Sequence, residues 1–365
     1  MAQLRLILPA LLFAVPLAAQ NPSRHALQGS DVAVYDLAGA VQIEPSGGNA
    51  VSVEVARGGA DLAKLEVAEG QLKGRPTLRV IFPGDRIKYP AMRDEGYTEL
   101  RVREDGTFGS QIHLHDHEHA HHHDDDEDDD DDASGRRVVI SSRDGLEAWA
   151  DLKIGVPTGR RVAVHLAVGK ITATNVNGRI ELETSNGPVV VNGSKGEVEV
   201  QVGSGDVQLS ASEGDLEVTT GSGDVQATKS NGRSISIQTG SGDVVASQLQ
   251  ATEVAVRTGS GGIKASGLKA PQVGLETGSG DVTVELQGTV DRLDVRTGSG
   301  NIAITAPANL GAQVDMQTAS GDIDSDFPLS VTRSGGDHLR GTVGDGKGRI
   351  SMETGSGGVR LLKSR

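Results

Sequence analysis

The sequence predicts an all-β protein built as a single parallel β-solenoid, and three observations carry this prediction. A six-residue motif, TGSGDV, occurs at residues 220–225 and returns nearly unchanged along the second half of the chain. Apolar and polar residues alternate around each copy. Gly is abundant, with 50 in 365 residues, whereas aromatic residues make up only 2%. A thin core of Val, Ile, Leu, Ala and Thr between glycine-rich corners is typical of stacked coils.

The repeat predicts the size of each coil. Successive motifs are separated by 18, 18, 19, 19, 19, 20, 21 and 36 residues. We expect coils of about 19 residues with two main strands each, and right-handed winding, because parallel crossovers are right-handed in nearly all proteins. The last gap is interpreted as two periods with a degenerate coil around 327–348. The motifs open at Thr184, Val202, Thr220, Thr239, Thr258, Thr277, Thr297, Thr318 and Thr354.

Within a coil, period-two alternation predicts which side chains point inward. In residues 234–247, Ile235, Ile237 and Thr239 alternate with polar Ser236 and Gln238. One set must face the core and the other the solvent. We therefore expect the motif threonines to be buried, with their hydroxyls bonded to backbone or to the threonine of the next coil.

The Gly-Ser-Gly corner is interpreted as a sharp bend. Glycine adopts positive φ without a Cβ penalty, so both glycines are expected there, and the following Asp is expected to accept hydrogen bonds from amides of its own turn. A calcium-binding ladder is the alternative, because these aspartates stack along one edge. Other coils carry Pro, Gly or Asn at this position, which favours the bend. The stacked residues are Asp206, Asp224, Asp243, Asp281 and Asp322.

The chain divides into four regions. Residues 1–20 are predicted to be a signal peptide, because Arg5 precedes a short apolar run and small residues follow at Ala18 and Ala19. That run is too short to span a membrane, so we expect an exported chain with no transmembrane span, located in the periplasm, on the cell surface or outside the cell. Residues 21–110 are expected to form irregular β coils that cap the solenoid. Residues 136–365 are expected to form the repetitive solenoid with TGSGDV corners, ending in a last strand at 359–363 whose basic residues protect its edge.

Residues 111–135 are predicted to be a disordered insert rich in His and Asp. Residues 113–132 hold seven of the ten histidines and eleven carboxylates, with no Lys or Arg. Imidazoles suit Zn, Cu or Ni, so weak metal binding is one interpretation, and a low-complexity segment that only aids solubility is the other. No other cofactor is expected. The candidate metal ligands are His113, His115, His117, His119, His121, His122, His123, Asp124, Asp125 and Asp126.

Charge and motif content exclude several function classes. The formal charge of −15 falls to −4 outside the insert, and no basic face suits a phosphate backbone, so nucleic acid is not an expected partner. The chain has no Cys, which excludes disulfides and thiolate chemistry. No Ser-His-Asp, P-loop or HExxH pattern occurs, and His165 and His338 are interpreted as isolated surface or corner residues. A carbohydrate-active β-helix enzyme is a remote alternative, because the coils lack the aromatic platforms that sugars need. The chain is therefore not expected to be an enzyme.

Residues 151–178, DLKIGVPTGRRVAVHLAVGKITATNVNG, resemble the bacterial adhesin-labelled β-strand-repeat family DUF4097. The TGSGDV and TSNGPV repeats and the closing run at 325–361 resemble it too. The resemblance extends over 27–365 apart from the insert. It implies an exported or envelope-associated β-solenoid without catalytic residues to carry over. We therefore expect a monomeric, non-enzymatic envelope or surface protein with an adhesin-like, scaffold or interaction role and an unidentified surface ligand. A divalent-metal-binding protein acting through the insert is the alternative.

Overall fold

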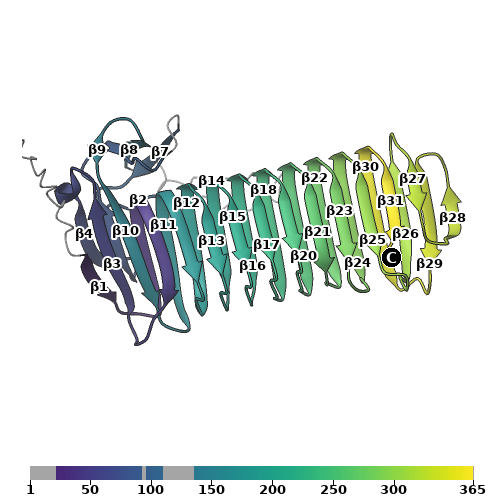
Figure 1. Cartoon of the computed structure of the whole chain (residues 1–365), viewed down its shortest axis with the longest axis horizontal. Helices are drawn as coiled ribbons and strands as arrows, with labels where there is room; N and C mark the ends of the chain where they lie inside the picture. The colour runs from purple at the N-terminus through teal and green to yellow at the C-terminus, as the bar shows by residue number, and fades with distance from the viewer. Residues whose placement is uncertain (1–21, 93–95, 110–134, 365) are drawn as a thin grey trace, which may run out of the picture.

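The computed structural model describes residues 22–92, 96–109 and 135–364. Strands dominate this part of the chain, and its one short 3-10 helix is Leu62–Lys64. Figure 1 shows an elongated stack of coils with a small additional sheet at the N-terminal end. The all-β, mainly parallel architecture predicted from the sequence is confirmed. The predicted signal peptide at 1–20 and the predicted insert up to residue 134 lie outside the described residues.

The first strand of every coil joins a parallel ladder, here called the first ladder. The register keeps equivalent residues opposite one another, as in the row Val218, Ile237, Val256 and Leu275. All four side chains are buried in the core. The strands in order are β12 (Gly178–Asn186), β14 (Val198–Ser204), β16 (Leu216–Ser222), β18 (Ser234–Ser241), β20 (Glu253–Ser260), β22 (Gln272–Ser279) and β24 (Arg292–Ser299).

The second strand of every coil joins a parallel second ladder on the other side of the core. Short isolated bridges from Asn177 through Lys195 to Lys269 connect the coils along the remaining edge. The apolar interior between these three edges contains Val, Ile, Leu and Ala, as the composition predicts. The strands are β13 (Val189–Asn192), β15 (Val207–Ser210), β17 (Val225–Thr228), β19 (Val244–Ser247), β21 (Ile263–Leu268), β23 (Val282–Leu286) and β25 (Ile302–Ala306).

The motif threonines lie where the sequence predicts them. Thr239 is 2% exposed and Thr277 is 2% exposed. The hydroxyl of Thr277 donates to the carbonyl oxygen of Gly261 at 2.8 Å, and Thr297 donates to Gly280 at 3.0 Å. Thr277 and Thr297 therefore bond backbone of the preceding coil, which is the first of the two expected alternatives. The buried hydroxyls of Thr184 and Thr220, in contrast, have no hydrogen-bond partner in the described structure.

The Gly-Ser-Gly corner differs from the prediction in one respect. Only the second glycine has positive φ, for example 142° at Gly223 and 152° at Gly242, whereas the first glycine, such as Gly259, does not. The first glycine is required for another reason. A Cβ at Gly259 would lie 2.6 Å from the carbonyl oxygen of Gly240 in the preceding coil. The two glycines thus serve a bend and a close approach of neighbouring coils, respectively.

The sequence predicts that each motif aspartate accepts hydrogen bonds from amides of its own turn. In the structure these aspartates accept hydrogen bonds from amides of the next coil. The amide of Asp243 donates to Oδ1 of Asp224 at 2.9 Å, and the amide of Asn301 donates to Oδ1 of Asp281 at 2.7 Å. The residues of these two pairs are 19 and 20 positions apart, one coil along the chain. The prediction was wrong because a single coil, considered alone, does not show which amides its neighbour leaves at the corner.

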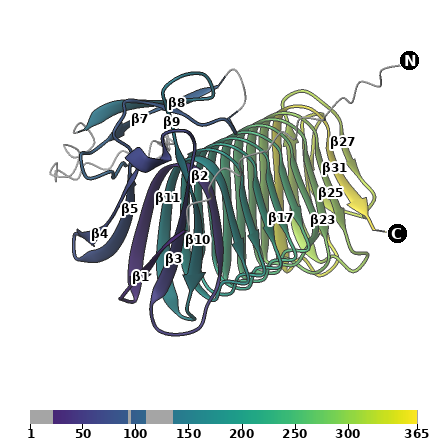
Figure 2. The same ribbon diagram turned by 60° about the vertical axis from the view of Figure 1, so that its left-hand side comes forward.

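Residues from the N-terminal region complete the stack. β2 (Asp31–Pro45) pairs in parallel with β11 (Arg160–Thr174), and both strands are long enough to run through both ladders. β10 (Trp149–Val156) pairs in parallel with β2 and antiparallel with β3 (Val51–Gly58). These antiparallel pairings close the N-terminal end of the second ladder (Figure 2). The remaining antiparallel strands here are β1 (Ser23–Leu27), β4 (Glu66–Leu72) and β5 (Arg75–Ile81).

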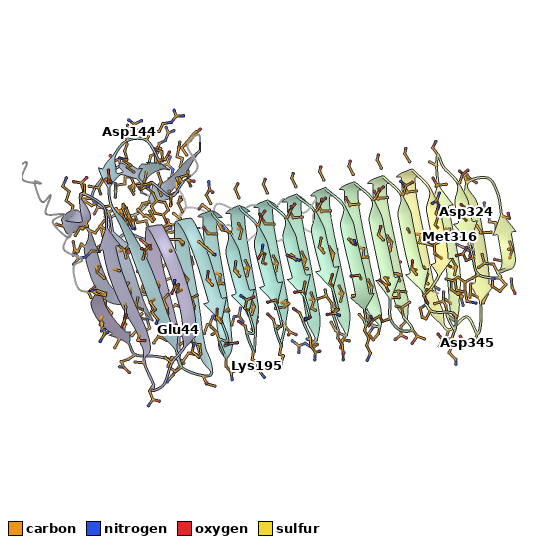
Figure 3. The ribbon with its side chains drawn as sticks, in the orientation of Figure 1. Glu44, Asp144, Lys195, Met316, Asp324 and Asp345 are labelled. Carbon is orange, nitrogen blue, oxygen red and sulfur yellow. The ribbon has the colours of Figure 1, made fainter. Side chains whose placement is uncertain are left out.

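A four-stranded sheet stands beside the N-terminal coils. Its strand order is β7-β8-β6-β9, with β7 and β8 antiparallel. The described chain leaves this hairpin at Gly109 and re-enters at Gly135. Figure 3 labels Asp144 in this sheet. The strands are β6 (Arg86–Lys88), β7 (Tyr97–Val102), β8 (Arg136–Ser141) and β9 (Leu146–Glu147).

The C-terminal coil is not the last coil in space, contrary to the prediction. β30 (Gly348–Ser356) pairs in parallel with β24 on one side and with β26 (Ala312–Thr318) on the other. β31 (Val359–Lys363) likewise lies between β25 and β27 (Ile323–Ser325). Both edges of the final strand are therefore paired, so its basic residues do not protect a free edge.

An antiparallel hairpin covers the end of the first ladder instead. β29 (His338–Val343) pairs with β26, and β28 (Ser330–Ser334) pairs with β29. The 36-residue gap therefore contains this hairpin and not a degenerate parallel coil (Figure 1). An end hairpin prevents β26 from presenting unpaired backbone to another chain.

Candidate interaction surface

The outward side chains of the first ladder form one continuous row, here called the central row. Each member precedes the inward residue at the motif-threonine position and lies opposite its equivalent in the next coil. Because strand alternation buries that inward residue, the neighbouring side chain points away from the core; at the N-terminal end Tyr35, packed against Phe108, is itself buried. From the N-terminal end the row is Tyr35, His165, Glu183, Gln201, Thr219, Gln238, Arg257, Glu276, Arg296, Glu353 and Gln317.

A groove of about 1250 Å³ follows the C-terminal half of this row. It extends from Gln238 across six coils, and Asp337 and His338 of the end hairpin line its far end. Along its length, corner glycines such as Gly259 and Gly278 provide no side chain, while the central row stands beside them. The first glycine of each corner therefore permits close coil packing and also keeps the groove open.

The groove carries alternating charges. Arg257 Nε lies 3.8 Å from Glu276 Oε2, and Arg296 Nε lies 3.7 Å from Glu353 Oε2. All four side chains are more than half exposed, between 56% and 61%. Exposed ion pairs at such distances contribute little to stability, so both signs of charge remain accessible to a partner.

Asp315 of β26 contacts Gln317 and His338, which line the far end of the groove. Its Oδ1 lies 3.0 Å from His338 Nε2, and Arg340 Nε donates to its Oδ2 at 3.0 Å. Gln317 Nε2 also donates to Oδ1 at 3.2 Å. Partial burial opposes ionisation, but the hydrogen bonds from Arg340 and Gln317 dominate and lower the pKa of Asp315. This carboxylate therefore attaches the end hairpin to β26.

A second polar cluster occupies the N-terminal end of the row. Oε2 of Glu183 lies 2.5 Å from Nδ1 of His165, whose ring stacks on Tyr35 at a centroid distance of 4.2 Å. Phe108 contacts Tyr35 edge-on at 5.7 Å. Burial, followed by the charge of Glu183, raises the pKa of Tyr35. The stacked aromatic rings and the ion pair give this cluster a packing role.

The interpretation of both histidines as isolated residues is therefore wrong. His165 and His338 each contact a carboxylate, and their side chains are only 20% and 15% exposed. Their partners are 18 residues away in the case of Glu183 and in another strand in the case of Asp315. The repeat period could have indicated the first pair, since 18 residues is one coil.

None of the predicted metal ligands can be placed, because His113 to Asp126 lie outside the described residues. Among the residues that are described, no group of three or more His, Asp or Glu could hold a metal ion. Four of the stacked corner aspartates, Asp206, Asp224, Asp243 and Asp281, present Oδ1 to an amide of the next coil, for example Asp206 to Asp224 at 3.1 Å. Their stacking is thus explained by backbone hydrogen bonds.

The fold and the surface define a repeat protein with a mainly parallel β architecture and one long polar groove. The sequence model of the Toastrack DUF4097 family matches residues 109–362, more than half of the chain. The chain belongs to this family. The match begins later than the resemblance noted above, which started at residue 27.

No curated protein matches the chain. Among solved structures, a crystal structure of a candidate cell adhesion protein from Clostridium sporogenes covers 94% of this chain and 100% of its own. The identity is 9% and the TM-score is 0.20, so this likeness carries no argument about function. In the described ranges no helix is long and apolar enough to cross a membrane.

Proposed function

We propose that the protein is an exported, non-enzymatic rod of the bacterial envelope or surface that binds an extended partner along its groove. The role is adhesin-like or that of a scaffold, and the rod winds as a right-handed solenoid of about 19-residue coils. The observation that carries the proposal is the groove itself, which crosses six coils without interruption. Membership of the Toastrack DUF4097 family supports it.

The dimensions of the groove favour a polymer over a small molecule. Parallel strands repeat at about 4.8 Å, so six coils extend over about 24 Å. The groove is open to solvent and lined mostly by Thr, Gly, Gln, Arg and Glu, with no Phe, Tyr or Trp in its lining. Small-molecule sites are mostly apolar and enclosed. An extended chain that carries polar groups of both charges along its length suits this surface better.

The charge pattern indicates what the partner must provide. Arg257 and Arg296 are separated by two coils, with Glu276 between them and Glu353 beyond. Like charges on the partner must therefore recur at about 9.6 Å, twice the strand spacing. Complementary charges set the register and orientation of a partner more than the total affinity. The identity of the envelope or surface ligand follows from experiment.

The role of the groove in binding is tested with beads that are coated with the protein. Their binding to intact bacterial cells and to immobilised peptidoglycan is measured. The double variant Arg257→Glu/Arg296→Glu should bind at least about tenfold more weakly than the unaltered protein, because it places four adjacent carboxylates in the groove. The control is Lys264→Glu/Lys269→Glu, which changes the net charge equally at exposed positions outside the groove. Equal loss in both variants would mean that overall charge, and not the groove, controls binding.

Export is part of the proposal and rests on the sequence of residues 1–20. The mature protein should begin near Gln20 or Asn21 and be found outside the cytoplasm. N-terminal sequencing of protein purified from its native host checks this. Recovery of Met1 would contradict it.

A divalent-metal-binding role for residues 113–132 is the second candidate function. The observation that favours it is the concentration of seven histidines beside eleven carboxylates. Neutral imidazoles bind Zn, Cu or Ni, and the carboxylates raise the local cation concentration. Such binding would be independent of the groove, and its test is described below at the scale of the whole molecule.

A further inference from the structure

The C-terminal coil, residues 348–363, occupies a slot between coils that precede it in the sequence. Two strands form each wall of the slot, β24 and β25 on one side and β26 and β27 on the other. Figure 3 labels Met316 and Asp324 in the coil beyond the slot and Asp345 in the connection that leads into it. The slot is therefore complete before the last residues of the chain enter it.

The slot is complementary to this coil on both walls. Ile350, Met352, Val359 and Leu361 of the coil are fully buried. Seven registered pairs join β30 to β24 and seven join it to β26. These contacts involve strand backbone and repeat side chains. The same coil of a second copy of the chain carries the same groups and could make the same contacts.

Hydrogen bonds at the corner also cross both walls. Thr354 Oγ1 of the coil donates to the carbonyl oxygen of Gly300 at 2.9 Å, and Thr318 Oγ1 donates to Gly357 at 2.9 Å. The amide of Gly358 donates to Asn301 Oδ1 at 2.9 Å. An empty slot would leave the buried hydroxyls of Thr318 and Thr354 unpaired, so a replacement must be a strand pair with the same motif.

The coil is joined through its N-terminal side to the chain that forms the walls. The connection is residues 344–347. Gly344 and Gly346 there have φ of 56° and 63°, and Lys347 Nζ lies 2.8 Å from Asp345 Oδ2 in an exposed pair. Short glycine-containing connections of this kind act as hinges in domain swapping, where one element is exchanged between identical chains.

We propose that the C-terminal coil is an exchangeable element and that the slot binds the same coil of a second copy of this chain. Each swapped copy regains every contact of the closed form. Because the tethered coil has a high effective concentration, the closed monomer predominates in dilute solution, and exchange becomes detectable when copies are concentrated. Glu353 and Thr354 of the coil line the groove, so a swapped pair would join two grooves through shared coils.

Cysteine cross-linking of the full-length protein tests this proposal. Asp324 and Arg360 lie directly opposite each other on β27 and β31, and their side chains are 65% and 62% exposed. The chain contains no cysteine of its own, so only introduced cysteines can form a disulfide. Copies with Asp324→Cys are mixed at high concentration with copies with Arg360→Cys, and disulfide-linked dimers are measured on non-reducing gels. The control mixture pairs Arg360→Cys with Lys264→Cys, an exposed residue elsewhere on the second ladder. The test mixture should form dimers at least about tenfold faster than the control, because swapping holds the two thiols together.

Two further variants make the outcome decisive. The double variant Asp324→Cys/Arg360→Cys should close within one chain and then form no mixed dimer. Deleting Asp345 and Gly346 shortens the hinge, which should raise the dimer fraction in light scattering while the β circular-dichroism signal is retained. If the double variant closes internally but the test mixture links no faster than the control, exchange does not occur and the coil is a permanent part of its own chain.

Discussion

At the scale of single residues, the corner glycines show how one motif meets two different requirements. Gly242 has a φ of 152°, and a Cβ there would lie 2.1 Å from the carbonyl oxygen of Gly223. Both the backbone conformation and the space exclude a side chain. Ser241, between the two glycines, is exposed and meets neither constraint.

We therefore expect Gly242→Val to lower the free energy of unfolding by about 3 kcal/mol or more, since it combines backbone strain with overpacking. Ser241→Ala should change it by no more than about 0.5 kcal/mol, as is usual for surface substitutions. Chemical denaturation of both variants measures the difference. Similar stabilities would show that this corner is not constrained as the geometry implies.

Asp36 is the exception among the inward residues of the first ladder. It lies opposite Leu166, which in turn lies opposite the buried Thr184, so Asp36 occupies the threonine position of its coil. It is 1% exposed, and neither of its carboxylate oxygens has a hydrogen-bond partner in the described structure. Burial, together with the nearby charge of Asp151, raises its pKa well above the ordinary value of 3.8.

This arrangement predicts a stability that falls as the pH rises. Between 3.8 and the raised pKa of the folded state, the native protein holds a proton that the unfolded chain releases. The free energy of unfolding should therefore decrease with a slope of at most about 1.4 kcal/mol per pH unit. Tyr89, whose pKa burial raises to about 12, stays neutral through this range. In the Asp36→Asn variant, the free energy of unfolding should decrease less with rising pH than in the unaltered protein.

Urea denaturation at a series of pH values from 4 to 8 measures this effect. The control is Glu285→Gln, which neutralises an exposed carboxylate on the second ladder. The difference between Asp36→Asn and the unaltered protein should grow with pH, whereas the difference for Glu285→Gln should not. Parallel curves for all three proteins would show that Asp36 ionises in the folded protein as it does in the unfolded chain, so that its pKa is not raised.

At the scale of elements, the order of coils in space differs from their order in the sequence. The spacing of 21 residues between Thr297 and Thr318 is close to one period, yet their strands are separated by an intervening strand, β30. The connection at 307–311 therefore crosses two strand spacings. A repeat period counts residues along the chain, and it does not show which copies are neighbours.

Antiparallel strands cover one ladder at each end of the stack. They pair with backbone groups that these ladders would otherwise offer to other chains, whereas at the C-terminal end of the second ladder the parallel strand β27 pairs only with β31 among the described strands. β3 and β1 cover the N-terminal end of the second ladder, and the β28–β29 hairpin covers the C-terminal end of the first. The hairpin depends on Asp315, which contacts both His338 and Arg340.

At the scale of the whole molecule, the groove and the insert are separate features that one deletion can distinguish. Removing residues 113–132 should abolish most Zn or Cu uptake in calorimetry, because it removes seven histidines. The melting temperature and the β circular-dichroism signal should hardly change, since the insert interrupts only the β7–β8 hairpin. Metal uptake by the full chain should be lost below pH about 6.5 as the imidazoles protonate.

A matched control replaces the seven histidines with Asn and keeps the eleven carboxylates. It should lose metal uptake to the same extent while leaving bead binding through the groove intact. If the deletion instead unfolds the protein, the insert contributes to the structure. If it abolishes bead binding while the Asn variant does not, the carboxylates and not the groove recognise the partner.

The sequence by itself determined the features that depend on local chemistry. Alternation placed Ile235, Ile237 and Thr239 inward, and all three are buried. The repeated glycine corners and the scarcity of aromatic residues predicted an all-β, mainly parallel stack. Such inferences succeed because strand periodicity and glycine conformation are properties of a few consecutive residues.

Only the tertiary structure decided what depends on which coils are neighbours. It placed the C-terminal coil inside the stack, gave His165 and His338 their carboxylate partners, and joined the central row into a groove. It also showed that Asp224 serves the amide of Asp243 in the next coil. The physical reason is that nearly identical repeats offer nearly equal local pairings, so the choice among them is made by the connections, end hairpins and packing of the complete fold.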